Sequence, residues 1–147
     1  MTVKAGQKCT AIRRIFVPEN KIDEIRKSIS RVLSQTLIGN PMNEKVRMGS
    51  LAGQDQRKEV KQQVQKLLAS SHIIYGSLDS VELLDADILK GAFMSPLLLE
   101  NLHPFSDDGP HDIEAFGPVS TLMPYRNIDE AIELSKRGKG FTMQYQL

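Results

Sequence analysis

The 147-residue sequence predicts one α/β domain in which helices cover a sheet through crossover connections. Three observations lead to this prediction. Thr10–Val17 is rich in β-branched and aromatic residues and stops at a proline, which is typical of a strand. The next segment repeats its apolar residues at steps of three and four, which is typical of a helix. Strand-like and helix-like segments then alternate along the chain, with no internal repeat, low-complexity tract or linker.

The first helix is expected over residues 22–33. Asn20 is placed to cap it, and Asp23 and Glu24 lie in the first turn, where the helix dipole favours negative charge. Gly39-Asn40-Pro41 ends the helical pattern. One apolar face is formed by Ile22, Ile25, Ile29, Val32 and Leu33.

A second helix is expected to begin near Asp55, with a narrow apolar stripe of Val60, Val64, Leu67 and Leu68. Further strands are expected at His72–Tyr75, Phe93–Glu100 and Val119–Tyr125. Pro96 suits an edge strand or a bulge better than the centre of a sheet.

The last helix is predicted after Asn127, which forms a capping box with Glu130. It ends at Gly138 and would bury Ile128, Ala131, Ile132 and Ser135. Gly140–Leu147 begins like one more strand.

Composition excludes several classes of function. Nineteen basic against eighteen acidic residues leave a formal charge of +1, which argues against a nucleic-acid or membrane-surface binder. No apolar run approaches the roughly 20 residues that span a bilayer, and the first residues lack the apolar core of a translocation signal. A single cysteine forms no internal disulfide, so a cytoplasmic location is expected.

Cys9 is the only thiol and lies in Gly6-Gln7-Lys8-Cys9, just before the first predicted strand. A glycine beside a lone cysteine suits a nucleophile that must be presented to a cleft. Positive charge from Lys4, Lys8, Arg13 and Arg14 would lower the thiol pKa. The alternative is a small buried side chain, which is the usual place of a free cysteine. The residues by themselves leave both interpretations open.

The second candidate segment is Glu114-Ala115-Phe116-Gly117-Pro118-Val119. A carboxylate can accept hydrogen bonds from the two vicinal hydroxyls of a ribose, and an aromatic ring two residues later can pack on a flat ring. Taken alone, the segment is more simply interpreted as a loop acid followed by the start of a strand.

The three histidines have no metal-ligand spacing with each other or with Cys9, so no metal site is expected. His103 and His111 are expected in a solvated polar loop. Asp107, Asp108 and Asp112 lie in the same loop but lack a calcium-loop pattern. The sequence also has neither a glycine-rich dinucleotide fingerprint nor a phosphate loop.

Together, these segments carry a resemblance. Gly6-Gln7-Lys8-Cys9 resembles the catalytic-cysteine motif of the aldehyde dehydrogenase superfamily, and Glu114–Val119 resembles its E-x-F-G-P-V motif. Between them, Gly39-Asn40-Pro41 is similar to the family's G-(D/N)-P turn, and Gly91–Pro96 to its G-x-F-x-x-P strand. Four motifs in the right order over nearly the whole chain make a specific signal.

The wording of Thr2–Arg14 and of Val46–Gly49 narrows the resemblance. Both are similar to the dehydrogenase part of the bifunctional ring-opening proteins of phenylacetate degradation, which join an aldehyde dehydrogenase to an enoyl-CoA-hydratase-like domain. The resemblance implies a small aldehyde substrate, here a CoA-linked semialdehyde. Which aldehyde it is, and whether the cofactor is NADP or NAD, stay open.

The resemblance also implies roles for the candidate residues. Cys9 would attack the aldehyde carbon to give a thiohemiacetal, which passes hydride to NADP+ or NAD+ and becomes a thioester that water cleaves. The backbone N–H of Cys9 would donate to the oxyanion. Glu114 would hold the nicotinamide ribose, and Phe116 would help to place the ring.

In the family, the dinucleotide-binding domain, the general-base Glu and the oxyanion Asn precede the cysteine motif. Residues 1–147 are therefore expected to be part of a three-layer catalytic domain without the dinucleotide-binding domain, inactive alone and binding no dinucleotide. Phe141–Leu147 departs from the family pattern. A truncated product, a frameshift and a gene remnant are all compatible with this.

Exposed faces and strand edges should favour a homo-oligomer. Two alternatives to the enzyme remain. One is a non-enzymatic α/β remnant or interaction module, and the other is a lone-cysteine esterase or transferase with a histidine base near Cys9.

Overall fold

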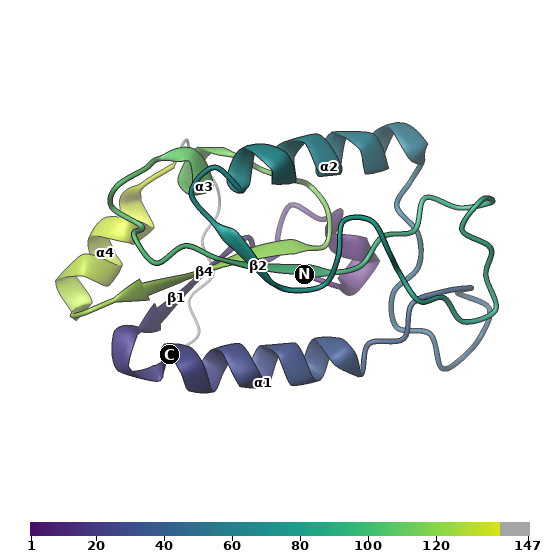
Figure 1. The fold of residues 1–147 in the computed structure, drawn as a ribbon, viewed down its shortest axis with the longest axis horizontal. Coiled ribbons are helices and arrows are strands. Elements are labelled where there is room, and N and C mark those ends of the chain that lie inside the picture. The colour runs from purple at the N-terminus through teal and green to yellow at the C-terminus, as the bar shows by residue number, and fades with distance from the viewer. Residues whose placement is uncertain (139–147) are drawn as a thin grey trace.

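The computed structural model describes residues 1–138, which fold around one four-stranded sheet (Figure 1). The strand order is β1-β4-β3-β2. β4 pairs in parallel with both β1 and β3, and β2 adds to β3 antiparallel. The strands are β1 (Arg14–Pro18), β2 (His72–Tyr75), β3 (Leu97–Glu100) and β4 (Val119–Tyr125).

The helices make the outer layers. In Figure 1, α2 lies over one face of the sheet and α1 under the other, with α4 beside one end of β4. The predicted layered α/β architecture is therefore confirmed. The helices are α1 (Ile22–Ser34), α2 (Gln54–Leu67), α3 (Gly109–Asp112) and α4 (Ile128–Lys136), with 3-10 turns at η1 (Val3–Gly6) and η2 (Glu19–Lys21). No helix within residues 1–138 is long and apolar enough to cross a bilayer.

Two strands, β1 and β3, begin later than predicted. β1 begins only at Arg14, although the Ile12 carbonyl just before it still accepts a 2.6 Å hydrogen bond from the Ser120 hydroxyl. Pro96 lies directly before β3, which is an interior strand, so its assignment to an edge is wrong. Because Pro96 precedes the ladder, its missing N–H removes no bond from the sheet.

The two predicted helix caps have different outcomes. Asn127 does cap α4, since its Oδ1 accepts a 3.0 Å hydrogen bond from the Glu130 N–H. Asn20 does not cap α1, because η2 intervenes and Lys21 takes the capping position without a side-chain bond. α4 is also rotated from the prediction: Leu134 and Ser135 are buried, whereas Ile128 and Ile132 are exposed. The strand predicted at Gly140–Leu147 lies outside the described residues.

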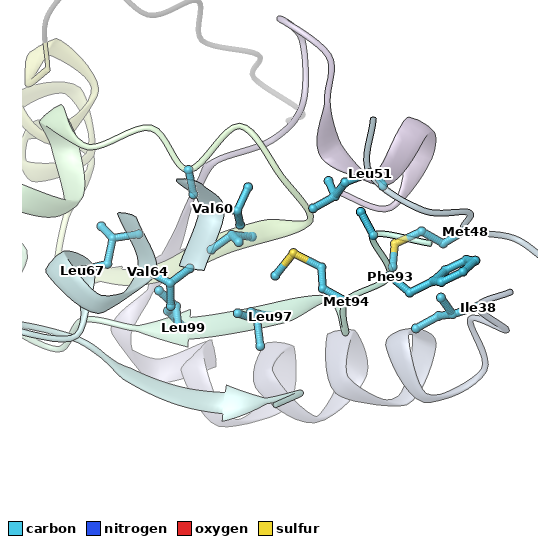
Figure 2. Close-up of a cluster of buried hydrophobic side chains, with 14 residues drawn as sticks. Ile38, Met48, Leu51, Val60, Val64, Leu67, Phe93, Met94, Leu97 and Leu99 are labelled. Atoms are coloured by element: carbon cyan, nitrogen blue, oxygen red, sulfur yellow. The ribbon is translucent and has the colours of Figure 1, made fainter. Parts of the chain in front are cut away.

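The main core lies between α2 and the sheet (Figure 2). The predicted stripe of Val60, Val64 and Leu67 is buried there, over Leu97 and Leu99 of β3. The same cluster continues beneath the long loops through Ile38, Met48, Leu51, Phe93 and Met94.

The opposite face of the sheet holds a partly buried ion pair. Glu100 alternates with Leu99 along β3 and therefore points to the α1 side. Its carboxylate accepts hydrogen bonds of 3.0, 2.7 and 2.9 Å from Arg26 of α1. His72 Nε2 lies 3.3 Å from the same carboxylate. A buried carboxylate needs such partners, so Arg26 ties α1 to the sheet.

Replacing Leu97 with Ala should lower the free energy of unfolding by about 2–5 kcal/mol, because its fully buried side chain would leave a cavity. Leu89→Ala is the matched control: Leu89 is 87% exposed, and its loss should change stability by less than about 0.5 kcal/mol. Urea unfolding followed by circular dichroism measures both. Equal effects of the two substitutions would contradict the described core.

Candidate functional site

Cys9 lies in an exposed turn ahead of β1. The turn is preceded by three successive residues in the left-handed region, Lys4, Ala5 and Gly6, with φ values of 51°, 50° and 71°. The Lys8 N–H donates to the Gly6 carbonyl at 2.9 Å, and the Ala11 N–H donates to the Lys8 carbonyl at 2.9 Å. The thiol is therefore presented on a turn instead of a strand edge, and its alternative assignment as a buried side chain is wrong.

The turn is anchored on both sides. Ala5 is buried in the core, and the Gln7 Oε1 accepts a 2.9 Å hydrogen bond from the Ala52 N–H. Gly6 lies against the backbone of Gly117, where an added Cβ would be 2.0 Å from the Gly117 carbonyl oxygen. Positive φ and this close approach both require glycine at position 6.

The segment with Glu114 and Phe116 alternates between buried and exposed residues. Ala115 and Gly117 are buried, whereas the Glu114 and Phe116 side chains are exposed. Phe116 has a φ of +30°, and its carbonyl accepts a 3.1 Å hydrogen bond from Gln56 Nε2 of α2. Buried neighbours on each side thus hold two exposed side chains in place.

Sheet topology brings these two segments together. β1 and β4 are parallel neighbours, so the turns that precede them lie at the same edge of the sheet. A shallow recess of about 10 Å³ separates the segments, which is room for about one water molecule. Its walls are Gly6, Ala11, Ile12 and Arg13 on one side and Glu114, Ala115, Phe116, Gly117 and Val119 on the other.

His111 is placed very differently from its prediction as a solvated loop residue, because it is fully buried. Its Nδ1 lies 2.8 Å from Arg14 Nη1, and its Nε2 lies 2.7 Å from the Pro104 carbonyl. Arg13 donates to the His111 carbonyl at 2.9 Å. Burial lowers the pKa of His111, and the nearby Arg14 and Arg137 add to this effect.

Sequence reasoning missed this cluster, although one signal was present. Arg13 and Arg14 are two charged residues inside the otherwise mostly apolar segment Thr10–Val17, and both contact His111. Charged side chains in such a segment need polar partners when helices cover both faces of the sheet.

The other histidines lie apart from this cluster. His72 faces Glu100, and His103 is exposed. Within residues 1–138, no three His, Cys, Asp or Glu side chains are grouped to hold a metal ion.

Comparison with known proteins identifies the family. The family model for the aldehyde dehydrogenase family matches residues 1–137, and the chain belongs to that family. This finding confirms the resemblance carried by the cysteine and E-x-F-G-P-V motifs.

Individual relatives support the same assignment. The chain is 37% identical over 140 residues to the 3,4-dehydroadipyl-CoA semialdehyde dehydrogenase of Aromatoleum evansii, covering 95% of this chain and 27% of that protein. It is 40% identical over 95 residues to Protein MaoC of Klebsiella aerogenes, covering 63% of this chain and 26% of that protein. The chain thus spans about a quarter of the length of the curated relatives it matches.

Solved structures share the fold. A betaine aldehyde dehydrogenase from Staphylococcus aureus in complex with NAD+ aligns with a TM-score of 0.78 and 26% identity, over 92% of this chain and 26% of that one. A succinic semialdehyde dehydrogenase from Streptococcus pyogenes in complex with NADP+ aligns with a TM-score of 0.78 and 24% identity, over 91% of this chain and 28% of that one.

Gly6→Ala should lower the free energy of unfolding by more than about 1 kcal/mol, because the new methyl group would strike the Gly117 backbone in a left-handed turn. Gly49→Ala is the control, since its added Cβ would meet no atom within 4 Å, and it should stay within about 0.5 kcal/mol of the wild type. Denaturant titration compares the two. If Gly6→Ala is as stable as Gly49→Ala, the described contact is absent.

Proposed function

We propose that this chain supplies the nucleophile of an aldehyde-oxidising dehydrogenase, with Cys9 as the catalytic thiol. The observation that carries the proposal is the exposed Cys9 turn, anchored through Gly6 against the segment of Glu114 and Phe116. Membership of the aldehyde dehydrogenase family supports it.

In this proposal, Cys9 Sγ attacks the aldehyde carbon, and a C–S bond forms as the carbonyl oxygen gains negative charge. The backbone N–H of Cys9 donates to that oxygen in the thiohemiacetal. The alkoxide form of the thiohemiacetal, whose thiol proton has already been lost, would become a thioester by losing a hydride, which is two electrons with one proton. Water then cleaves the C–S bond, which releases the acid and restores the thiol.

We propose that Glu114 and Phe116 contact one edge of a nicotinamide riboside. The exposed Glu114 carboxylate can accept hydrogen bonds from the two ribose hydroxyls, and the exposed Phe116 ring offers a flat apolar surface. NAD+ or NADP+, when bound, supplies the electron acceptor. Fixed backbone on both sides of each side chain would keep them oriented.

The recess beside these residues is far smaller than a nicotinamide ring. The residues that line it would therefore contact only part of a dinucleotide. We accordingly propose that residues 1–147 form part of a catalytic domain, and we expect the chain alone to bind no dinucleotide and to be inactive as a dehydrogenase.

For the substrate, we propose a CoA-linked semialdehyde of phenylacetate degradation. A relative that matches 95% of this chain is named for a CoA-linked semialdehyde, which supports this substrate class. A cytoplasmic location is proposed from the single cysteine.

The second candidate is a non-enzymatic interaction module. Exposed Val32, Ile128 and Ile132 favour it, together with the place of β1 as an edge strand among residues 1–138. The two candidates differ in what Cys9 can do without any cofactor.

An activated ester tests the nucleophile directly, because acyl transfer to sulfur needs no electron acceptor. With p-nitrophenyl acetate, Cys9 Sγ should displace p-nitrophenolate and become S-acetylated. We expect acetylation at least about tenfold faster than in a free peptide of residues 4–13 at the same pH, because the folded turn orients a donor to the oxyanion. Nitrophenolate release and intact mass give the rate and stoichiometry.

Cys9→Ser is the matched control and should abolish the S-acetyl adduct. A folded chain that reacts no faster than the peptide would contradict the proposed catalytic thiol and leave the interaction module as the better account.

We expect the chain to self-associate into a dimer or a higher homo-oligomer through its exposed apolar side chains. Light scattering should report a mass of at least two chains for the wild type. Ile132→Lys should shift the mass toward one chain, because Ile132 is 45% exposed on α4 and a buried lysine there would oppose association. A wild-type monomer at working concentration would contradict the proposal.

A further inference from the structure

The hydrogen bonds around His111 define its protonation state. Arginine can only donate, so Arg14 Nη1 at 2.8 Å requires Nδ1 of His111 to be an acceptor. A carbonyl can only accept, so the Pro104 oxygen at 2.7 Å requires the proton to be on Nε2. Both contacts are satisfied by one form only, which is the neutral Nε2–H tautomer.

The same cluster joins three parts of the chain. Arg14 of β1 also donates to the Leu134 carbonyl at 3.3 Å and to the Arg137 carbonyl at 2.8 Å at the end of α4. Arg13 donates to the backbone of His111 itself. His111 lies in α3, three residues before Glu114, and β1 follows the Cys9 turn. The cluster therefore connects β1, which follows the Cys9 turn, to α3, which precedes Glu114.

We propose that His111 is a positioning residue, whose neutral imidazole locks the segment 109–117 onto β1 and so holds Glu114 and Phe116 beside the Cys9 turn, and that protonation of His111 releases this segment. The inference rests on the proposed roles of Glu114 and Phe116. Its physical basis is the pair of hydrogen bonds that the neutral His111 imidazole makes with Arg14 and Pro104. These bonds do not depend on whether Cys9 reacts.

Protonation would break the lock because it places a second N–H opposite the Arg14 guanidinium. The charged groups that face His111 act in both directions: cations on β1 and after α4 oppose its protonation, and acids flanking α3 favour it. The cations are Arg14 and Arg137, and the acid is Asp108. Asp107 also interacts electrostatically with the imidazole, and Arg13 and Asp112 lie next to His111.

The direction of the pH effect follows from the lowered pKa of His111. Above pH of about 6.5, the ordinary histidine value, the folded and unfolded chains both hold neutral imidazole, and the stabilisation is complete. As the pH falls below that value, the unfolded chain takes up a proton that the folded chain resists. Stability is then lost progressively until the folded pKa is passed.

The test uses the full chain and two readouts that do not depend on activity. Nitrogen–proton NMR of the imidazoles reports tautomer and titration, and hydrogen exchange reports protection of residues 109–117 against residues 54–67 of α2. The variants are His111→Leu, which cannot bond to Arg14 or Pro104, and His111→Gln, whose amide can both accept and donate. His103→Gln is the control, because His103 is an exposed histidine in the same connection between β3 and β4.

His111 should be the Nε2–H tautomer at pH 7.5 and should titrate below about pH 6.5, the ordinary histidine value. His111→Leu should reduce protection of residues 109–117 by about tenfold or more, with α2 nearly unchanged, because a charge-assisted hydrogen bond is lost. His111→Gln should restore protection to within about threefold of wild type. Wild-type protection of the same segment should fall selectively below pH 6.5 or so.

Titration of His111 at or above about pH 6.5, the ordinary histidine value, would overturn the proposal. A second result would also overturn it. In that result, His111→Leu leaves the protection of residues 109–117 unchanged, unfolds the chain or lowers protection equally in α2, and His111→Gln restores nothing. Such a pattern describes a merely structural residue. Ester reactivity of Cys9 is scored separately. An inert Cys9 in a chain with an intact lock would refute the proposed function and not this one.

Discussion

The candidate site depends on the contact between two glycines, Gly6 and Gly117, whose backbones meet because neither has a side chain. Gly6 approaches the Gly117 backbone so closely that an added Cβ would lie 2.0 Å from a carbonyl oxygen. On its other side, Gly117 lies under Val60 of α2, where a Cβ would be 2.7 Å from a valine methyl group. The Cys9 turn, the Glu114–Phe116 segment and the core beneath α2 are thereby fixed to one another.

Parallel pairing explains why such distant segments meet. Cys9 and Glu114 are separated by more than a hundred residues, yet each precedes one of the adjacent parallel strands β1 and β4. Both turns must therefore lie at one edge of the sheet. The Arg14–His111 hydrogen bond connects β1 to α3, so the two segments are held by backbone contact at Gly6 and Gly117 and by this hydrogen bond.

Local patterns predicted most of the fold. The α2 stripe and the Asn127 cap depend on neighbours three or four residues away, and both were found. Asn20 and Pro96 were assigned wrongly because an intervening 3-10 turn and the order of the strands decide their surroundings. The segments of Cys9 and Glu114 could be connected beforehand only through their family resemblance. His111 was missed because its partner Arg14 lies 97 residues away.

The Cys9 turn and the Glu114–Phe116 segment should form one site in solution, and a spin label can test this directly. Cys9 is the only cysteine, so a nitroxide label can be attached there without any substitution. We expect strong paramagnetic broadening of the amide signals of Ala115, Phe116 and Gly117, and little at Ile132 on α4. Sharp signals across residues 114–117 in the labelled chain would contradict it.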